Sequence, residues 1–372
     1  MSTDASSPLR GTATERLHTV DALRGIAALA VVWYHLTYAD TDFLRDGWFK
    51  HTGHYGGVAG VQAFFVISGF IIPYALHRAG YTLRGFFRFF AKRVTRLDPP
   101  YLVCVAVIIA MSVTRHHFAT LRIWNLHDVS VPQVLAHLGY LNAVLGYRWL
   151  DTVYWTLGIE LQYYLLIALL FPLAARLPRR TAWLVPVALI AGSWLPHPIR
   201  ETPFHDNLIL SYLGVFAIGI LTFQHRAGLV DRSRYFTLLS IAAVAVYARL
   251  DLLTAGTAVA TALAITFVTV TFRPLTWLGE FSYSLYLIHG PVWWVLYAAA
   301  MAYLPSTQPW RQGTACVTLA VTLFVARGLF VAVERPAQRW SSRLRYAKPP
   351  REAIAVSTPM PDAEGAVLVA EA

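Results

Sequence analysis

Residues 19–38 read TVDALRGIAALAVVWYHLTY, a largely apolar stretch as long as the roughly 20 residues that a helix needs to cross a bilayer. Comparable stretches recur along the chain, and the sequence predicts ten membrane-spanning helices in all. They lie at residues 19–38, 58–77, 99–114, 154–175, 182–196, 207–224, 235–249, 252–272, 281–303 and 311–333. We therefore expect the all-α fold class, as a polytopic integral membrane helix bundle.

The amino-acid composition agrees with this expectation. Of the 372 residues, 56% are hydrophobic and 14% are charged, whereas a soluble domain carries about 25% charged residues. The shortfall in charge excludes an ordinary soluble enzyme, a disordered chain and a nucleic-acid-binding domain. The net charge of +11 then concerns membrane topology, because Lys and Arg residues concentrate in the cytoplasmic segments of membrane proteins.

The positions of the basic residues orient the predicted bundle. With a cytoplasmic N-terminus, most of the 31 Lys and Arg residues fall on the cytoplasmic side, as the positive-inside rule requires. We therefore expect both termini in the cytoplasm and a multi-pass protein of the plasma (inner) membrane. A membrane domain at 17–340 is expected between disordered tails at 1–16 and 341–372. Outer segments 39–57 and 115–153 are the places for a lid or short surface helices.

The first predicted span carries ionisable residues that membrane burial does not explain. Arg24 and His35 are eleven residues apart, and at about 100° per residue they share one helix face. Asp21 lies one turn before Arg24 on that face. One interpretation is that Arg24 and His35 reach the inner and outer headgroups respectively. The alternative is a functional site, because ionisable groups inside a membrane are costly.

A basic amphipathic helix is predicted before the third span. Arg88, Lys92 and Arg96 recur every four residues with Phe residues between them, and Arg93 adjoins them. We expect this helix on the inner surface, stopped by the prolines at 99–100. It suits anionic-lipid binding, and clustered Arg and Lys also suit a phosphate site.

Other polar residues stand out within later spans. Glu160 is predicted about two turns into its span at a depth similar to that of His35, so it needs a partner. His289 precedes a Gly-Pro break near mid-membrane, where a structural and a catalytic role are both open. Ser68 with Gly69 is most simply a close helix contact. Glu334 with Arg335 is expected as an inner-surface ion pair that ends the last helix. No spacing indicates a metal site.

Together these segments resemble the acyltransferase-3 family of integral membrane acyltransferases. The most specific element is Asp21-x-x-Arg24-Gly25 followed by His35. The other matching segments follow in order as Phe64-Phe65-Val66-Ile67-Ser68-Gly69-Phe70, Arg93-x-x-Arg96-Leu97-x-Pro99, Trp155-x-Leu157-x-x-Glu160, Ser282-Tyr283-Ser284-Leu285-Tyr286-Leu287-Ile288-His289 and Glu334-Arg335-Pro336. One departure is Leu161, where the family often has a second acidic residue after the first. We expect a stand-alone membrane domain without the soluble hydrolase-like domain of some members.

The resemblance implies transfer of an acyl group, commonly acetyl, from acyl-coenzyme A to a hydroxyl, with no metal. Acceptors in the family include surface polysaccharides, lipid-linked sugars, glucans and secondary metabolites such as macrolides. A thioester is already activated, so the main demand is removal of the hydroxyl proton. We assign that step to His35, with Glu160 hydrogen-bonded to its other ring nitrogen. Arg24, Arg93 and Arg96 are assigned to the coenzyme A phosphates, and the candidate supporting residues are Asp21, Ser68, Trp155 and His289.

A function from another class competes with this one. A proton-coupled transporter or flippase for a lipid-linked or polar solute would also use buried Arg, His and Glu residues and Pro breaks. The lack of an internal repeat in the sequence counts against the common transporter architectures. A purely structural membrane scaffold leaves His35 and Glu160 unexplained.

Overall fold

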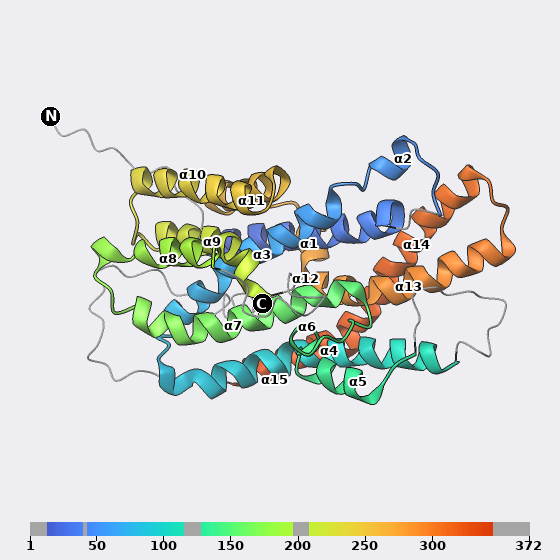
Figure 1. Cartoon of the computed structure of the whole chain (residues 1–372), viewed down its shortest axis with the longest axis horizontal. Helices are drawn as coiled ribbons and strands as arrows, with labels where there is room; N and C mark the ends of the chain where they lie inside the picture. Colours follow the sequence, from blue (N-terminus) through green and yellow to red (C-terminus); the bar gives the residue numbers. More distant parts are fainter. Residues whose placement is uncertain (1–12, 40–42, 115–127, 196–207, 345–372) are drawn as a thin grey trace.

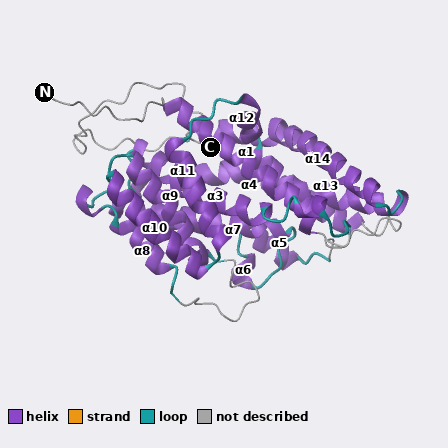
Figure 2. Cartoon of the chain, turned by 90° about the horizontal axis from the view of Figure 1, so that it is seen from above, coloured by secondary structure: helices purple, strands orange, loops and turns teal. Residues whose placement is uncertain are grey.

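The computed structural model describes residues 13–39, 43–114, 128–195 and 208–344, and in these ranges all regular structure is helical (Figures 1 and 2). The longer helices are α1 (Ala13–Tyr34), α3 (Gly56–Arg78), α4 (Phe86–Thr114), α7 (Trp155–Ala174), α9 (Leu213–Arg226), α10 (Arg232–Arg249), α11 (Leu252–Phe267), α13 (Ser282–Tyr303) and α14 (Gln308–Leu329). The shorter helices are α2 (Trp48–His51), α5 (Val131–Leu138), α6 (Asn142–Leu145), α8 (Leu184–Gly192), α12 (Arg273–Glu280) and α15 (Arg335–Ser342). The expected all-helical architecture is confirmed.

Helix α3 is the central element, and glycines let its neighbours approach closely. A Cβ atom on Gly60 would strike the carbonyl oxygen of Ala27 in α1. On the opposite side, a Cβ atom on Gly69 would lie 3.1 Å from the Cα atom of Gly219 in α9. Small residues permit such backbone contacts between membrane helices. The close helix contact predicted at Gly69 is therefore present.

Two hydrophobic clusters pack around this centre. One joins α3, α7 and α9 with α10 and α11, and the stacked rings of Tyr163 and Phe216, 4.2 Å apart between centroids, lie within it. The other joins α1, α4, α13 and α14. Figure 1 shows the first group at the left of the molecule and the end of α13 and α14 at the right. Helices α1 and α3 contribute residues to both clusters, so they lie where the two clusters meet.

Six helical segments are long and apolar enough to cross a membrane: Trp48–Arg78, Leu83–Thr114, Thr152–Ala174, Ile209–Arg226, Ser282–Tyr303 and Gln308–Ser342. A helix occupies each of the ten predicted stretches, but α1, α8, α10 and α11 are not among the six. These findings define a helical membrane protein.

Short helices occur in the two segments that the sequence analysis named as places for a lid or short surface helices. Helix α2 lies within the segment 39–57, and α5 and α6 lie within the segment 115–153. Most of the two predicted tails falls outside the described residues. Helix α1 begins at Ala13, inside the predicted N-terminal tail.

The prediction that the prolines at 99–100 stop the basic helix is wrong. Helix α4 runs from Phe86 to Thr114 through both prolines. Two prolines remove two helical hydrogen bonds, but neighbouring helices compensate for such losses inside membrane proteins. Helix α15 packs on this helix, where Ser341 Oγ donates to the carbonyl oxygen of Lys92 at 3.0 Å. The basic residues therefore enter the bundle on a continuous helix.

The expectation for Glu334 is also wrong. This side chain is buried, and its Oε2 accepts hydrogen bonds from the backbone N–H, at 3.0 Å, and the hydroxyl of Ser284. Its Oε1 accepts from Gln338 Nε2 at 3.0 Å. The helix does not end there, because a π-helical turn at Phe330–Glu334 joins α14 to α15. Glu334 thus ties the last helix to α13 rather than forming a surface ion pair.

Candidate active site

His35 begins a π-helical turn, His35–Ala39, at the end of α1. Its Nδ1 lies 2.9 Å from the carbonyl oxygen of Val31. Because a carbonyl oxygen only accepts hydrogen bonds, Nδ1 carries the ring proton and Nε2 keeps its lone pair. This is the tautomer that a base needs, and the backbone of α1 itself fixes it.

The π-helical turn is held in place by two side-chain hydroxyls. Thr37 Oγ1 donates to the carbonyl oxygen of Trp33 at 2.7 Å, and the hydroxyl of Tyr297 in α13 donates to the carbonyl oxygen of Leu36. Such turns inside helices are frequent at functional sites. The local geometry therefore orients the His35 ring away from the regular helix path and toward α13.

His289 faces His35 from α13, with 4.9 Å between the ring centroids. Its Nδ1 donates to the carbonyl oxygen of Tyr286 at 2.7 Å, so its Nε2 also keeps a lone pair. Among the described residues this buried Nε2 has no hydrogen-bond partner. His35 and His289, which are far apart in the sequence, are thus neighbours in the fold.

His35 lines a cavity of about 750 Å³, which we name the outer cavity because the topology expected from the sequence would place it toward the outer side. Aromatic side chains make up much of its wall, namely Tyr34, Trp149, Trp155, Tyr212, Tyr286, Trp293 and Trp294. Polar groups in the wall include Gln62, Arg148, Asp151 and Asp251. A mostly apolar cavity with a few polar groups is the usual form of a small-molecule site.

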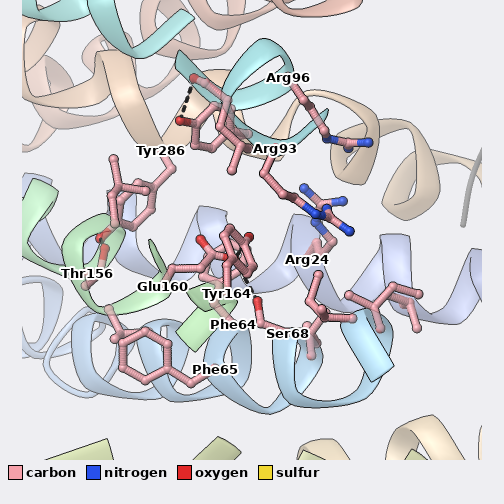
Figure 3. A pocket seen from close by; sticks show the side chains of 18 of the residues that line it. Arg24, Phe64, Phe65, Ser68, Arg93, Arg96, Thr156, Glu160, Tyr164 and Tyr286 are labelled. Carbon is pink, nitrogen blue, oxygen red and sulfur yellow. Dashed lines mark hydrogen bonds between the residues drawn. The ribbon is translucent and has the colours of Figure 1, made fainter. Parts of the chain in front are cut away.

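Glu160 has different partners from the one expected. Its Oε1 accepts hydrogen bonds from Ser68 Oγ at 2.8 Å and from the Tyr164 hydroxyl. The His35 ring is hydrogen-bonded to the carbonyl oxygen of Val31, where a hydrogen bond to Glu160 was expected. Two residues at a similar depth in the membrane can still point in different directions. Glu160 faces a second cavity, which His35 does not line (Figure 3).

This second cavity, which we name the inner cavity because the expected topology would place it toward the cytoplasm, is lined by the three arginines assigned to phosphate. Arg24 of α1 and Arg93 and Arg96 of α4 line it, with their guanidinium groups on one side of the pocket (Figure 3). Arg93 and Arg96 are only 4% and 6% exposed. None of the three arginines forms an ion pair with another described residue. The cations of the ion pairs found there are Lys50, Arg234 and Arg327. Three neighbouring arginines, two of them buried, that form no ion pair with other described residues have the charge needed to bind an anion.

Aromatic rings support this cluster. The Arg93 guanidinium lies 5.4 Å from the ring centroids of both Phe89 and Tyr164. Its Nε has no hydrogen-bond partner within the described part of the chain. Asp21 and Ser68 line the same cavity. Arg93 therefore retains hydrogen-bonding capacity for a ligand while its position is held by packing.

The two cavities adjoin. Val61 of α3 and Tyr286 of α13 line both of them. The Tyr286 hydroxyl donates to the carbonyl oxygen of Val153 at 2.9 Å and accepts from Thr156 Oγ1 at 2.7 Å, which fixes the ring. The inner cavity is narrow, at about 80 Å³. The three arginines thus line one of two adjoining cavities, and His35 lines the other.

Some residues of the site escaped the sequence analysis. Tyr164 lies one turn after Glu160 and Tyr286 lies one turn before His289, so helical spacing was a usable signal for both. Asp151 carried no such signal. It precedes the span Thr152–Ala174, and burial raises the pKa of its carboxyl group to about 7. No group of three or more His, Cys, Asp or Glu side chains in the described ranges could hold a metal ion.

The sequence of the chain matches a known protein family. The profile of the acyltransferase-3 family, described as an acyltransferase domain, matches residues 17–327, and the chain belongs to this family. The expectation drawn from the sequence segments is thereby confirmed.

Three relatives illustrate the similarity. BcsY of Komagataeibacter xylinus, named as a membrane-bound transacylase, is 30% identical over 223 residues, which cover 56% of this chain and 51% of the relative. The peptidoglycan O-acetyltransferase OatA of Listeria monocytogenes is 25% identical over 384 residues, 86% of this chain and 56% of OatA. The acyltransferase MdmB of Streptomyces mycarofaciens is 28% identical over 174 residues, 45% of this chain and 42% of MdmB. The chain thus spans about half the length of these relatives. No solved structure matches it.

Proposed function

We propose that the protein is a membrane O-acyltransferase that moves an acyl group, acetyl in the simplest case, from acyl-coenzyme A to a hydroxyl group. The observation that carries this proposal is that two cavities with complementary contents adjoin. One is lined by three arginines that form no ion pair with other described residues, and the other by His35 with an unprotonated Nε2. Family membership supports the reaction class.

The arginines would hold the donor. Coenzyme A carries several phosphate charges, and planar guanidinium groups bind phosphate in a bidentate manner. Burial of Arg93 and Arg96 favours this role over simple attachment to lipid headgroups. The eleven residues between Arg24 and His35 correspond to about 16 Å along the helix axis. The pantetheine arm is long, thin and uncharged, so it suits the narrow inner cavity and would carry the thioester past Tyr286 to His35.

His35 would then act as the general base. Its Nε2 takes the proton of the acceptor hydroxyl while that oxygen attacks the thioester carbonyl carbon. The carbon–sulfur bond breaks, and the departing sulfur takes the proton back from the imidazolium. The products are the acyl ester and free coenzyme A thiol. A neutral imidazole in the correct tautomer is the species that this sequence requires.

His289 would support the base rather than touch the hydroxyl. When His35 becomes protonated, its Nε2–H can donate to the unpartnered Nε2 of His289. This hydrogen bond stabilises the imidazolium and needs no carboxylate. Glu160, bonded to Ser68 and Tyr164, lies on the proposed donor side, in the wall of the inner cavity.

The donor and the acceptor would approach from opposite sides. We propose ten membrane spans with both termini in the cytoplasm of a plasma-membrane protein, so that the arginines face the cytoplasm, where coenzyme A is made. The outer cavity then receives a hydroxyl-bearing glycan, lipid or metabolite. The name of one relative, a peptidoglycan O-acetyltransferase, supports a glycan acceptor.

Purified protein in detergent tests the proposal. Acetyl-coenzyme A is incubated with a panel of glycosides, lipid-linked sugars and macrolides, and free thiol is measured. Thiol release that depends on the acceptor, together with the acylated product by mass spectrometry, is the expected result. No thiol release with any acceptor, together with proton-coupled solute uptake in proteoliposomes, would contradict an acyltransferase and support a transporter.

A further inference from the structure

The outer cavity contains hydrogen-bonding capacity that the chain does not use. Gln62 Oε1, Trp149 Nε1 and Asp151 Oδ2 all belong to residues that line it, and none has a hydrogen-bond partner among the described residues. All three atoms are buried. Buried polar groups are nearly always hydrogen-bonded, so each such group needs a specific explanation. Their occurrence in one wall indicates a ligand with complementary groups.

Asp151 is the most constrained of the three. It is 2% exposed, and its Oδ1 accepts from the backbone N–H of Val153 at 3.2 Å. Its Oδ2 occupies the space above Gly290, because a Cβ atom at that position would collide with it. Glycine at 290 therefore makes room for this carboxyl group against α13. An apolar residue at 151 would fill the same space without the cost of a buried, half-bonded carboxyl.

The loop that carries Asp151 is itself rigidly held. The backbone N–H of Leu150, the preceding residue, donates to His137 Nε2 at 3.0 Å. His137 Nδ1 then carries the ring proton and bonds the Tyr101 hydroxyl of α4 at 2.7 Å. Burial lowers the pKa of His137 to about 4, so the ring stays neutral and this tautomer is kept. Asp151 is thus pre-positioned rather than placed at the end of a free loop.

Asp151 also lies close to the proposed catalytic base. Its Oδ2 lies against Gly290, and the preceding residue, His289, faces the His35 ring at 4.9 Å. His35 thus contacts His289 and Asp151 contacts Gly290, the next residue of α13. His35 and Asp151 also line the same cavity. An acceptor molecule bound at His35 would therefore occupy the cavity that Asp151 also lines.

We propose that Asp151 positions the acceptor by accepting a hydrogen bond from a second hydroxyl group, next to the hydroxyl that reacts at His35. Gln62 and Trp149 complete this polar wall as acceptor and donor. Acceptors are then vicinal diols, and an isolated hydroxyl group is a poor substrate. This inference rests on the proposed function. It assigns Asp151 a positioning role in acceptor selection and no proton transfer.

Two probes of nearly equal size and shape test the proposal, trans-cyclohexane-1,2-diol and cyclohexanol. We expect thiol release from acetyl-coenzyme A with a kcat/KM at least about tenfold higher for the diol, because a site built to bond a hydroxyl discriminates against the analogue that lacks it. Asp151→Asn keeps the helix-capping oxygen. It should remove most of the preference for the diol, because the KM for the diol should rise more than the KM for cyclohexanol.

Asp251 provides the matched control. It also caps a helix at the wall of this cavity, but its Oδ1 accepts from the Thr254 N–H and its Oδ2 from the Thr254 hydroxyl, both at 2.8 Å. Asp251→Asn should therefore leave the preference for the diol intact. Equal use of the two probes by the wild type, or an equal loss with both probes in Asp151→Asn, would overturn the proposal.

A binding measurement separates this proposal from the reaction itself. Several tryptophans line the cavity, so titration of tryptophan fluorescence reports binding of either probe without turnover. The diol should bind more tightly than cyclohexanol to the wild type and equally weakly to Asp151→Asn. If thiol release is absent but this binding difference is present, the proposed function fails and the diol site stands. If the binding difference is absent, the diol site fails whatever the activity.

Discussion

The rings of His35 and His289 lie 4.9 Å apart, and a backbone carbonyl bonds the Nδ1 of each. Each ring therefore presents an Nε2 lone pair. Two imidazolium charges at this separation would repel strongly, so the pair takes up one proton at a time. This arrangement lets His289 stabilise a protonated His35 without a carboxylate.

Replacement of His289 tests this supporting role. His289→Asn keeps an amide N–H to bond the Tyr286 carbonyl and removes the second ring nitrogen. We expect kcat to fall on the order of 10–100-fold, as for partners that orient a catalytic group, with KM for both substrates unchanged. The measurement is steady-state thiol release at saturating donor and acceptor. A normal kcat would show that His289 is only structural.

The inner arginines should govern the affinity for the donor. Arg93→Ala and Arg96→Ala each remove a charge-assisted phosphate contact, worth about 1.5–3 kcal/mol. The KM for acyl-coenzyme A should rise by the corresponding factor of roughly 10–150, and the KM for the acceptor should not. Arg88, exposed on the same helix, is the matched control, and Arg88→Ala should leave both constants unchanged. An equal effect of all three variants, through weaker membrane attachment, would support lipid anchoring instead.

Glu160 should affect the donor side and leave the base alone. Because Glu160 bonds Ser68 and Tyr164, Glu160→Gln removes a charge beside the arginines without changing the environment of His35. The KM for acyl-coenzyme A should change, while the pH at which kcat/KM reaches half its maximum should not. A displaced pH profile would mean that Glu160 orients His35 after all.

Cysteine labelling in whole cells tests the proposed topology. Both native cysteines, buried Cys104 and exposed Cys316, are first replaced. Val144→Cys in α6 and Thr82→Cys before α4 then place single thiols at exposed positions. An impermeant maleimide should label the first and not the second. The reverse pattern would invert the orientation, and labelling of both or neither would refute the number of spans.

The sequence was sufficient to predict the helices and the residues that line the two cavities. It was not sufficient to predict all of the hydrogen-bond partners of these residues. Apolar length identified each helical stretch, and helical periodicity placed Arg24 and His35 on one face, where they line adjoining cavities. Depth alone paired His35 with Glu160, although the angular position of α7 turns Glu160 toward Ser68. Depth along a helix says nothing about the direction in which a side chain points.

Contacts between segments far apart in the sequence were also not predicted. Glu334 bonds Ser284 across 50 residues, and Asp151 packs on Gly290. Neither pairing leaves a local pattern, because both depend on how α13 lies between α4, α7 and α14. The continuous helix α4 was missed for a related reason: local rules for proline neglect the neighbouring helices that hold it.

The most direct test of the account is acceptor-dependent thiol release by His35→Asn. Asparagine keeps a donor for the Val31 carbonyl and removes the basic nitrogen, so the helix turn should be preserved, which size-exclusion profiles in detergent would verify. General base catalysis is worth about 10²–10⁴-fold, and turnover should fall by at least the lower of these factors. A folded variant that retains more than a tenth of wild-type turnover would contradict the assignment of His35 as the base.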